Sequence, residues 1–452
     1  MKLDLHYYDI YPKVFPVGKK APITIKPLGK HVAFFGEYKV VVQRLDSGHL
    51  RSEFYAWNHT DYTVTPDEDG CLRISYTAQA EGECYVRIYK DDNRLVQLAV
   101  YALDEDLSQR LPYRGDLHIH TCRSDGRQDP AIVCAEYRKQ GYDFIVVTDH
   151  HRYYPSLEAR KAYEGVKTAL NILPGEEVHM PGTDVHIVNA GGLFSVNGLL
   201  NTSPNYMETD GDLSGRRLND DIEVPEVIDM EEYERQIEAI EATIADCPAD
   251  VNLRWYAVCV WVFEHIRQAG GCGIYAHPYW ISDMWNVPEA LNFYMMEKHP
   301  FDAFEVLGGE RYYSHNGIQT ALYYDEYRHG RIHPIVGSTD SHNCLPEHNK
   351  GAAICSTIVF AHDNERGELL QSIKDRYSVA VDTISAEYRL VGEHRLQKYA
   401  CFLMENFYPL HDRQAALDGE MMRRYYVGQA SAEDVAAISA HADAMFDKYF
   451  LR

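Results

Sequence analysis

Two histidines and an aspartate lie within eight residues in the segment GDLHIHTCRSDG, residues 115–126, at His118, His120 and Asp125. Alternate residues of a strand point to the same face, so His118 and His120, at the end of a short strand, project together. The following turn, rich in Ser, Asp and Gly, can bring Asp125 back over the same point. Imidazole nitrogens and carboxylate oxygens are ligands that Zn, Mn and Fe accept, so the spacing indicates a metal site.

Two further segments end an apolar run with residues of the same kinds. FIVVTDHH, residues 144–151, ends in Asp149, His150 and His151. IVGSTDSH, residues 335–342, ends in Asp340 and His342, again two residues apart. An HxH pair alone is weak support for a metal site, and the repetition at several strand ends makes it much stronger.

The elements that must position these residues alternate between strand and helix. Asp129 followed by proline predicts the start of a helix over residues 131–140, which stops at Gly141. A buried strand is expected at 143–147 and another helix at 156–170. Strand–helix alternation with functional residues at the carboxyl ends of strands is typical of a β/α barrel.

The remaining regions predict three additions to the barrel, which is expected over residues 109–392. Short alternating strands at about ten-residue spacing predict an all-β sandwich, an accessory domain, over residues 1–108. Residues 193–255 read as an insertion of loop and helix that covers the barrel or forms a lid. Residues 393–452 predict a C-terminal helical extension.

Composition excludes several classes of protein. The chain of 452 residues has room for two or three domains, and its net charge of −24 opposes nucleic acid as a partner. No signal-peptide pattern and no apolar run of about 18 residues is present, so we expect no membrane association. The ten cysteines form no C-x-x-C pair, which favours reduced thiols and a cytoplasmic location. The oligomeric state has no signature in the sequence.

The motifs together resemble those of the PHP (polymerase and histidinol phosphatase) family of metal-dependent hydrolases, over residues of about 114 to 385. The resemblance implies an α/β fold, a distorted (β/α)7 barrel of the PHP type. It also implies three further ligands. They are Glu177 in a G-x-E motif, His186 on the next strand, and His277 in an A-H-P motif.

Two of these assignments have competitors beside them in the sequence. Glu176 competes with Glu177, and His179 competes with His186. Spacing favours Glu177 and His186. The strand 301–307 supplies the glutamate–valine pair of the family but not its usual asparagine, so Glu305 is expected to support a ligand and not to be one.

By resemblance, the nine matched residues would hold two or three divalent ions of Zn, Mn or Fe. The first ion would take His118, His120, Glu177 and Asp340, the second Asp125, His150 and His342, and the third Glu177, His186 and His277, with Glu177 bridging. Asp149 would orient a ligand histidine. The candidates for contact with substrate phosphate or the leaving group are Arg123, His151, Arg152 and Arg311.

Such ions lower the pKa of water and bind anionic oxygens, so the motifs predict a phosphoesterase acting on a small phosphorylated ester. A second hypothesis keeps the metals and changes the substrate to a carboxylic or carbamate ester, as in the carbaryl-hydrolase-like branch that the chain resembles. A third is a non-catalytic scaffold, which predicts missing ligands and a basic surface. The full ligand set and the acidic composition disfavour it.

Overall fold

The computed structural model describes residues 2–46, 59–200, 224–281, 283–309, 313–345, 355–383 and 389–452. The chain forms two compact units. Unit 1 combines Met1–Leu111 with His394–Gln414 and Ala440–Arg452, and unit 2 combines Pro112–Glu393 with Ala415–Ser439. Residues of the predicted C-terminal extension therefore contribute to both units.

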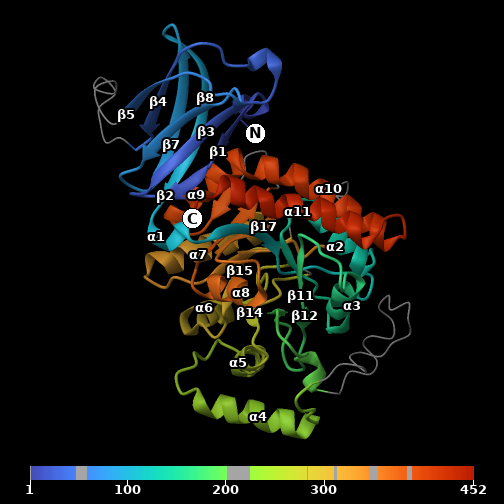
Figure 1. Ribbon diagram of the computed structural model, residues 1–452. Coiled ribbons are helices and arrows are strands. Elements are labelled where there is room, and N and C mark those ends of the chain that lie inside the picture. The colour runs from blue at the N-terminus through green and yellow to red at the C-terminus, as the bar shows by residue number, and fades with distance from the viewer. Residues whose placement is uncertain are drawn as a thin grey trace. The chain divides into compact units, whose positions relative to one another are not determined.

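Unit 1 contains two β-sheets, blue in Figure 1, in the region predicted to be all-β. The strands of one sheet, in the order β1-β3-β6, are Tyr8–Tyr11, Lys20–Pro27 and Leu72–Thr77. Those of the other, in the order β2-β8-β7-β4-β5, are Val14–Pro16, Asn93–Leu103, Gly82–Lys90, Tyr38–Arg44 and His59–Val64. Apolar side chains of both sheets share one core, which is the arrangement of a sandwich.

Helix α9 (His394–Asn406) packs within unit 1, although it lies almost 300 residues away from strand β8 in the sequence. The ring of Tyr101 lies 5.1 Å from that of Tyr399. Arg395 forms ion pairs with Glu81 at 2.6 Å and Asp106 at 2.7 Å. Late residues of the chain are therefore part of the first unit.

Unit 2 is a mixed α/β structure with two sheets. One has the order β11-β10-β9-β17-β18-β19, with strands Asn171–Leu173, Phe144–Val146, Leu111–Asp116, Cys355–Ala361, Ser378–Asp382 and Arg389–Val391. The other has the order β12-β13-β14-β15-β16, with strands Gly175–Val178, Ile187–Ala190, Cys272–Tyr275, Ala303–Leu307 and Ile335–Gly337. Parallel pairs join β9, β10 and β11, and also β14, β15 and β16.

Isolated parallel bridges link the two sheets at two points, between Ile119 and Ser341 and between His150 and Glu177. Each bridge lies just past the end of a strand and beside candidate ligands. The α/β class is confirmed. The described strands of unit 2 form two sheets, so a continuous (β/α)7 barrel stays a prediction.

The helices of unit 2 begin near the predicted positions. Asp129 caps α2 by accepting a hydrogen bond from the Ala131 amide at 3.0 Å, as its sequence predicts. The helices are α2 (Pro130–Lys139), α3 (Tyr154–Ala162), α4 (Met230–Thr243), α5 (Leu253–Gln268), α6 (Glu289–Lys298), α7 (Ile318–Arg328) and α8 (Arg366–Lys374).

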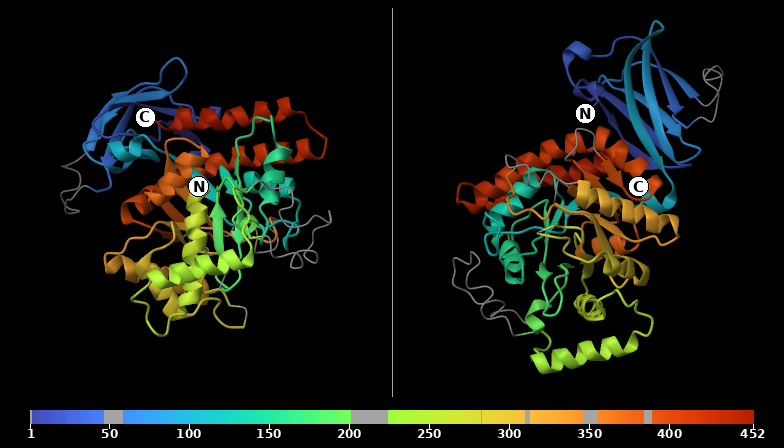
Figure 2. Two further views of the ribbon diagram at one scale, coloured as in Figure 1. Left: turned by 90° about the horizontal axis from the view of Figure 1, so that it is seen from below. Right: turned by 180° about the vertical axis from the view of Figure 1, so that it is seen from behind.

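Helix α4 lies in the predicted insertion, residues 193–255, of which residues 201–223 lie outside the described residues, and helix α5 begins near its end. Helix α5 lies between α4 and the strands (Figures 1 and 2). Tyr233 and Ile237 of α4 are buried in the same core as Trp261 of α5. Helix α5 packs on strands β13 and β14, and α4 packs on α5, so the two helices cover one side of the sheet that contains these strands.

A buried ion-pair network fastens helix α10 (Tyr408–Tyr426) to α2 within unit 2. The guanidinium of Arg138 is inaccessible and donates to Asp418 at 2.7 Å and to Asp143 at 2.8 Å. It also donates to the carbonyl of Tyr142 at 3.0 Å. Removing one partner of such a network leaves a buried charge without compensation.

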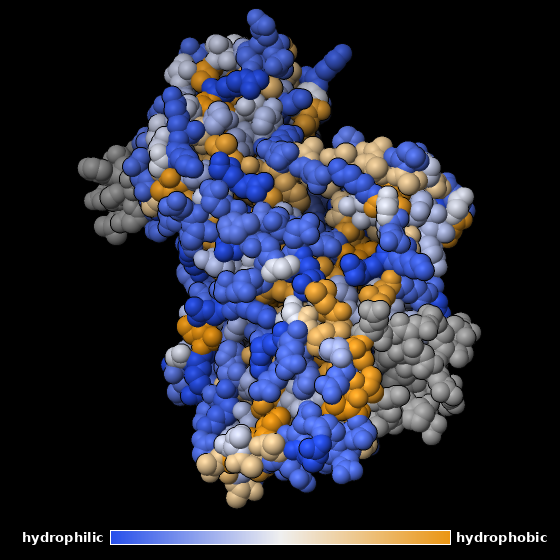
Figure 3. All heavy atoms as spheres, turned by 60° about the horizontal axis from the view of Figure 1, so that its bottom comes forward, coloured by the Kyte–Doolittle hydropathy of each residue, from blue (hydrophilic) through white to orange (hydrophobic). Residues whose placement is uncertain are grey.

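No helix among the described residues is long and apolar enough to cross a membrane. Hydrophilic residues predominate on the face drawn in Figure 3, in keeping with a content of 25% charged residues.

We predict that Asp418→Ala lowers the free energy of unfolding by about 3–5 kcal/mol, because the charge of Arg138 stays buried with one carboxylate fewer. Glu420→Ala on the same helix is the control. Its ion pair with Lys139 is about 40% exposed on both sides, so the expected loss is under about 1 kcal/mol. Denaturant titration of both variants measures the difference, and equal losses would contradict the role of the network.

Candidate metal centre

His118 and His120 follow strand β9, and the bridge between Ile119 and Ser341 places their segment beside the one that follows β16. As a result, Asp340 Oδ1 lies 2.9 Å from His120 Nε2 and 3.4 Å from His118 Nε2. The two histidines thus present Nε2 atoms to the same carboxylate oxygen, as their spacing predicts.

A second group surrounds Asp125, which the turn after β9 brings back over the histidines. Its carboxylate oxygens lie 3.1 Å from His342 Nε2, 3.6 Å from His150 Nε2 and 3.9 Å from His120 Nδ1. These four residues form one set of atoms that could hold a metal ion.

Glu177 lies at the centre of the remaining ligands. Its Oε1 is 2.8 Å from His186 Nδ1 and 3.6 Å from His277 Nε2. Its Oε2 is 2.5 Å from His150 Nδ1 and 3.5 Å from His118 Nε2. A carboxylate with imidazoles on both oxygens has the arrangement of a bridging ligand.

The structure therefore brings together all nine residues matched by the sequence motifs. They lie at seven strand ends or adjoining turns. The fold brings them together although 224 positions separate His118 from His342. That each of them binds a metal stays a prediction. The nine are His118, His120, Asp125, His150, Glu177, His186, His277, Asp340 and His342.

The donor atoms fit divalent metal ions. Glu177 is inaccessible, and neither of its oxygens accepts a well-formed hydrogen bond from the described residues. The Nε2 atom of His118 and the Nδ1 atom of His186 likewise have no such partner there. Zinc bonds of about 2.0–2.1 Å give a tetrahedron with edges of about 3.3 Å. The spacings of 2.9–3.6 Å that relate most of these nitrogens and oxygens resemble such edges.

The charges of the site also suit cations. Burial opposes ionisation of Glu177, yet the neighbouring histidines, His150 foremost, hold its pKa well below the usual range. Asp340 is affected in the same way, and its pKa is lowered chiefly by His118. Burial lowers the pKa of His120 to about 3. Ionised carboxylates and a neutral imidazole are the protonation states that metal ligands require.

Glu305 on β15 positions one of the ligands. It is inaccessible, and its Oε2 lies 3.0 Å from His118 Nδ1. An Nδ1–H that donates to this carboxylate leaves the Nε2 atom of His118 to face Asp340 and Glu177. Carboxylates commonly orient metal-bound histidines in this way. The placement agrees with the supporting role expected for Glu305.

Asp149 holds the turn that carries Asp125. Its carboxylate accepts hydrogen bonds from the amide and hydroxyl of Thr121, at 2.9 and 3.0 Å, and from the hydroxyl of Ser124 at 2.6 Å. That Asp149 also orients a ligand histidine stays a prediction.

Glu176 and Glu177 are distinguished by their surroundings. The buried carboxylate of Glu176 accepts hydrogen bonds from Asn189 at 3.1 Å, Ser195 at 2.8 Å and Asn197 at 2.9 Å. It therefore holds the segment after β13 and is turned away from the histidines. The geometry agrees with the choice of Glu177.

The predicted contact of Arg123 with substrate stays a prediction. Its guanidinium donates two hydrogen bonds to Glu158 on α3, at 2.9 and 2.7 Å, which hold it in an ion pair. Arg152 is 1% exposed. Arg311 lies outside the described residues. The contacts predicted for these two arginines stay predictions as well.

His151 lies beside the centre, and its ring stacks on that of His179 with centroids 4.4 Å apart. Burial lowers the pKa of His151 to about 4. His179 itself lies 3.5 Å from Glu177 Oε2, so the histidine that spacing disfavoured is part of the cluster as well. Its separation of two residues from Glu177 is the sequence signal that could have identified it.

Strained backbone marks the same location. Three non-glycine residues of the centre have positive φ angles, namely His151 at 58°, His277 at 21° and Asp340 at 47°. Such conformations cost about 1–3 kcal/mol each and persist where the surrounding structure holds them, often at functional sites.

An aromatic loop lies next to two of the ligands. The ring of Trp280 lies 6.2 Å from that of His186 and 6.3 Å from that of His277. Further along the loop, Trp285 is 37% exposed and Met284 is 75% exposed. The Trp280 ring therefore offers an apolar surface at the side of the centre where His186 and His277 lie.

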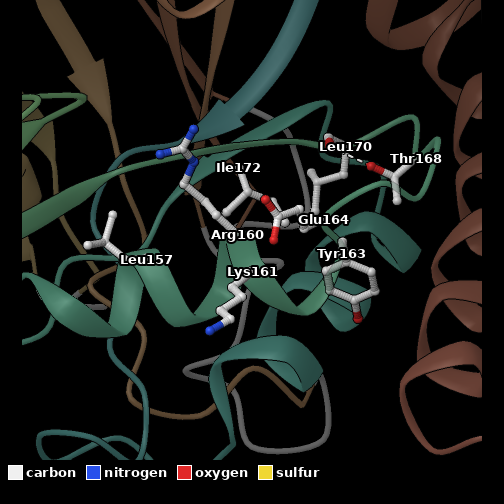
Figure 4. A pocket seen from close by; sticks show the side chains of 8 residues that line it. All are labelled: Leu157, Arg160, Lys161, Tyr163, Glu164, Thr168, Leu170 and Ile172. Atoms are coloured by element: carbon white, nitrogen blue, oxygen red, sulfur yellow. Dashed lines mark hydrogen bonds between the residues drawn. The ribbon is translucent and has the colours of Figure 1, made fainter.

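A separate pocket is lined by residues of α3 and of the segment that leads into β11, among them Arg160, Lys161 and Tyr163 (Figure 4). None of the candidate ligands lines it. The pocket is therefore not the metal centre.

No protein-family model matches the chain, and no curated protein does. Among solved structures, it is similar to a two-domain protein from Bacteroides vulgatus described as containing a PHP-like metal-dependent phosphoesterase. The two are 17% identical over 61% of this chain and 66% of that one, with a TM-score of 0.39. That match spans slightly less than two thirds of the Bacteroides chain.

Two other solved structures are similar at the same level. One is described as a metal-dependent phosphoesterase from Bifidobacterium adolescentis, 16% identical over 64% of this chain and 96% of that one, with a TM-score of 0.32. The other is an amidohydrolase from Chromobacterium violaceum, 18% identical over 52% of this chain and 88% of that one, with a TM-score of 0.28. At such identities and TM-scores, an activity must be argued from the site itself.

We predict that Glu305→Gln weakens metal binding about 10- to 100-fold, because the amide no longer accepts the His118 proton as a carboxylate does. Titration of the metal-free protein with Zn²⁺ or Mn²⁺ measures the affinity. Glu297→Gln, a change on helix α6 at a side chain 60% exposed, is the control. Unchanged affinity in Glu305→Gln would contradict the positioning role.

Proposed function

We propose that the protein is a metal-dependent hydrolase with a trinuclear centre, and that its substrate is a small phosphate ester. The observation that carries the proposal is the convergence of six histidines and three carboxylates, with the buried Glu177 at their centre. Divalent ions of Zn, Mn or Fe at these positions would supply a lowered water pKa and a Lewis acid for the ester oxygens.

The protein's own residues hold and orient this centre. Asp340, Glu177 and Asp125 provide its negative charge, and Glu305 fixes the direction of the His118 ring. With six neutral imidazoles and only three carboxylates as ligands, two or three divalent ions leave excess positive charge. An anionic phosphate balances that charge, which supports a phosphate ester as substrate.

A carboxylic or carbamate ester is the second candidate, and a specific observation favours it. Arg123 is held in an ion pair with Glu158. Trp280 offers an apolar surface beside His186 and His277. Arginines at the site would favour phosphate, whereas an aromatic wall suits a neutral ester.

We predict that His120→Ala and Asp340→Ala each lower hydrolysis by more than about 100-fold, since losing a ligand should cost at least as much as losing its supporting residue. His329→Ala, at a side chain 49% exposed on the C-terminal side of α7, is the matched control. Activity assays on metal-quantified proteins, with the thermal stability of the metal-free forms as a check on folding, test this. Full activity in either ligand variant would refute the assigned centre.

We further predict that the purified protein contains two or three divalent ions and releases phosphate from phenyl phosphate. Elemental analysis and parallel assays with phenyl phosphate, a phosphate diester and phenyl acetate measure this. Activity on the carboxylic ester alone would select the second candidate. A protein that binds no ion after reconstitution with Mn²⁺, Fe²⁺ or Zn²⁺ would rule out both.

A further inference from the structure

His179 repeats a spacing that the centre uses twice elsewhere. Glu177 is in strand β12 and His179 is one residue past its end, so the two side chains lie on the same side of the chain. His118 with His120, and Asp340 with His342, have the same separation of two residues. The end of β12 thus presents a carboxylate and an imidazole together.

The ring of His179 lies at one oxygen of the Glu177 carboxylate, Oε2, and His186 lies at the other, Oε1. The Nε2 atom of His179 lies 3.5 Å from Glu177 Oε2 and 3.0 Å from His150 Nδ1. His186 is instead 2.8 Å from Oε1. His179 therefore does not replace His186, and each carboxylate oxygen has its own histidine from this region.

The side of Glu177 that bears Oε2 forms a set of three donor atoms. Ligand atoms of His150, Glu177 and His179 lie close enough together to hold one ion. The separations of 3.0 and 3.5 Å from His179 Nε2 agree with the edge of about 3.3 Å expected for ligands around zinc, whereas His150 Nδ1 and Glu177 Oε2 lie closer, at 2.5 Å.

The position of His179 is fixed before any ion binds. Asn197 accepts a hydrogen bond from the His179 amide at 3.1 Å and donates to the Glu177 carbonyl at 3.0 Å. The ring stacks on His151 and meets the edge of His186, with centroids 4.4 Å away in both cases. Held on two faces and through its backbone, the imidazole needs little reorganisation to act as a ligand.

We propose that His179 is a metal ligand that, with Glu177 and His150, holds a divalent transition-metal ion on the Oε2 side of Glu177. This extends the ligand set beyond the nine residues found from the motifs. The inference rests on the proposed function, because it assumes that the centre holds metal ions. Ions that accept imidazole, such as Zn²⁺, Mn²⁺ or Fe²⁺, are the class that this subsite would take.

The test is metal titration of the metal-free full-length protein with Zn²⁺, combined with elemental analysis after dialysis. The variant is His179→Gln, whose amide oxygen can still accept a hydrogen bond from His150 but is a poor ligand for zinc. His329→Gln, at an exposed histidine, is the matched control. The thermal stability of the metal-free variants shows whether they are folded.

We expect His179→Gln to bind one ion fewer, or one ion at least about tenfold more weakly, while His329→Gln binds as the unchanged protein does. A folded His179→Gln that retains every ion at full affinity would overturn the inference and leave the proposed function intact. An unchanged protein that binds no Zn²⁺, Mn²⁺ or Fe²⁺ would overturn both.

Discussion

The structure of the centre depends on the cost of burying the Glu177 carboxylate. An ionised carboxylate removed from water loses several kcal/mol of solvation, which must be returned by charges or hydrogen bonds nearby. The described residues return little of it through hydrogen bonds, since both oxygens face imidazole nitrogens. The site is therefore organised to receive positive charge, and the histidines around it are the groups that share that charge.

The convergence of nine candidate ligands could be predicted because each signal is local. An apolar strand followed by His118 and His120, or by Asp340 and His342, requires only the two-residue repeat of a strand. The preference for Glu177 over Glu176 came instead from the G-x-E motif of the family that the sequence resembles, and the surroundings of the two carboxylates agree with it. Such patterns depend on a few neighbouring residues, which the sequence shows directly.

The roles of Arg123 and Asp149 could not be predicted, because they depend on partners chosen by tertiary packing. Arg123 meets Glu158 across 35 positions, and Asp149 meets Thr121 and Ser124 across 28 and 25. In both cases a charged side chain near the ligands forms hydrogen bonds that hold the loop after β9 in place. His179 is a different case. Spacing treated His179 and His186 as alternatives, whereas the fold places both histidines beside the Glu177 carboxylate.

The division of the chain between the units has a consequence for biosynthesis. Unit 1 needs Ala440–Arg452 as well as its N-terminal sheets, and unit 2 is interrupted in sequence by His394–Gln414. Domains generally fold as units while the chain emerges, starting from the N-terminal end. Here neither unit is complete when its first continuous segment has been synthesised. Unit 1 can be completed only after residues 440–452 have been synthesised, by which point the main segment of unit 2, Pro112–Glu393, has already been made.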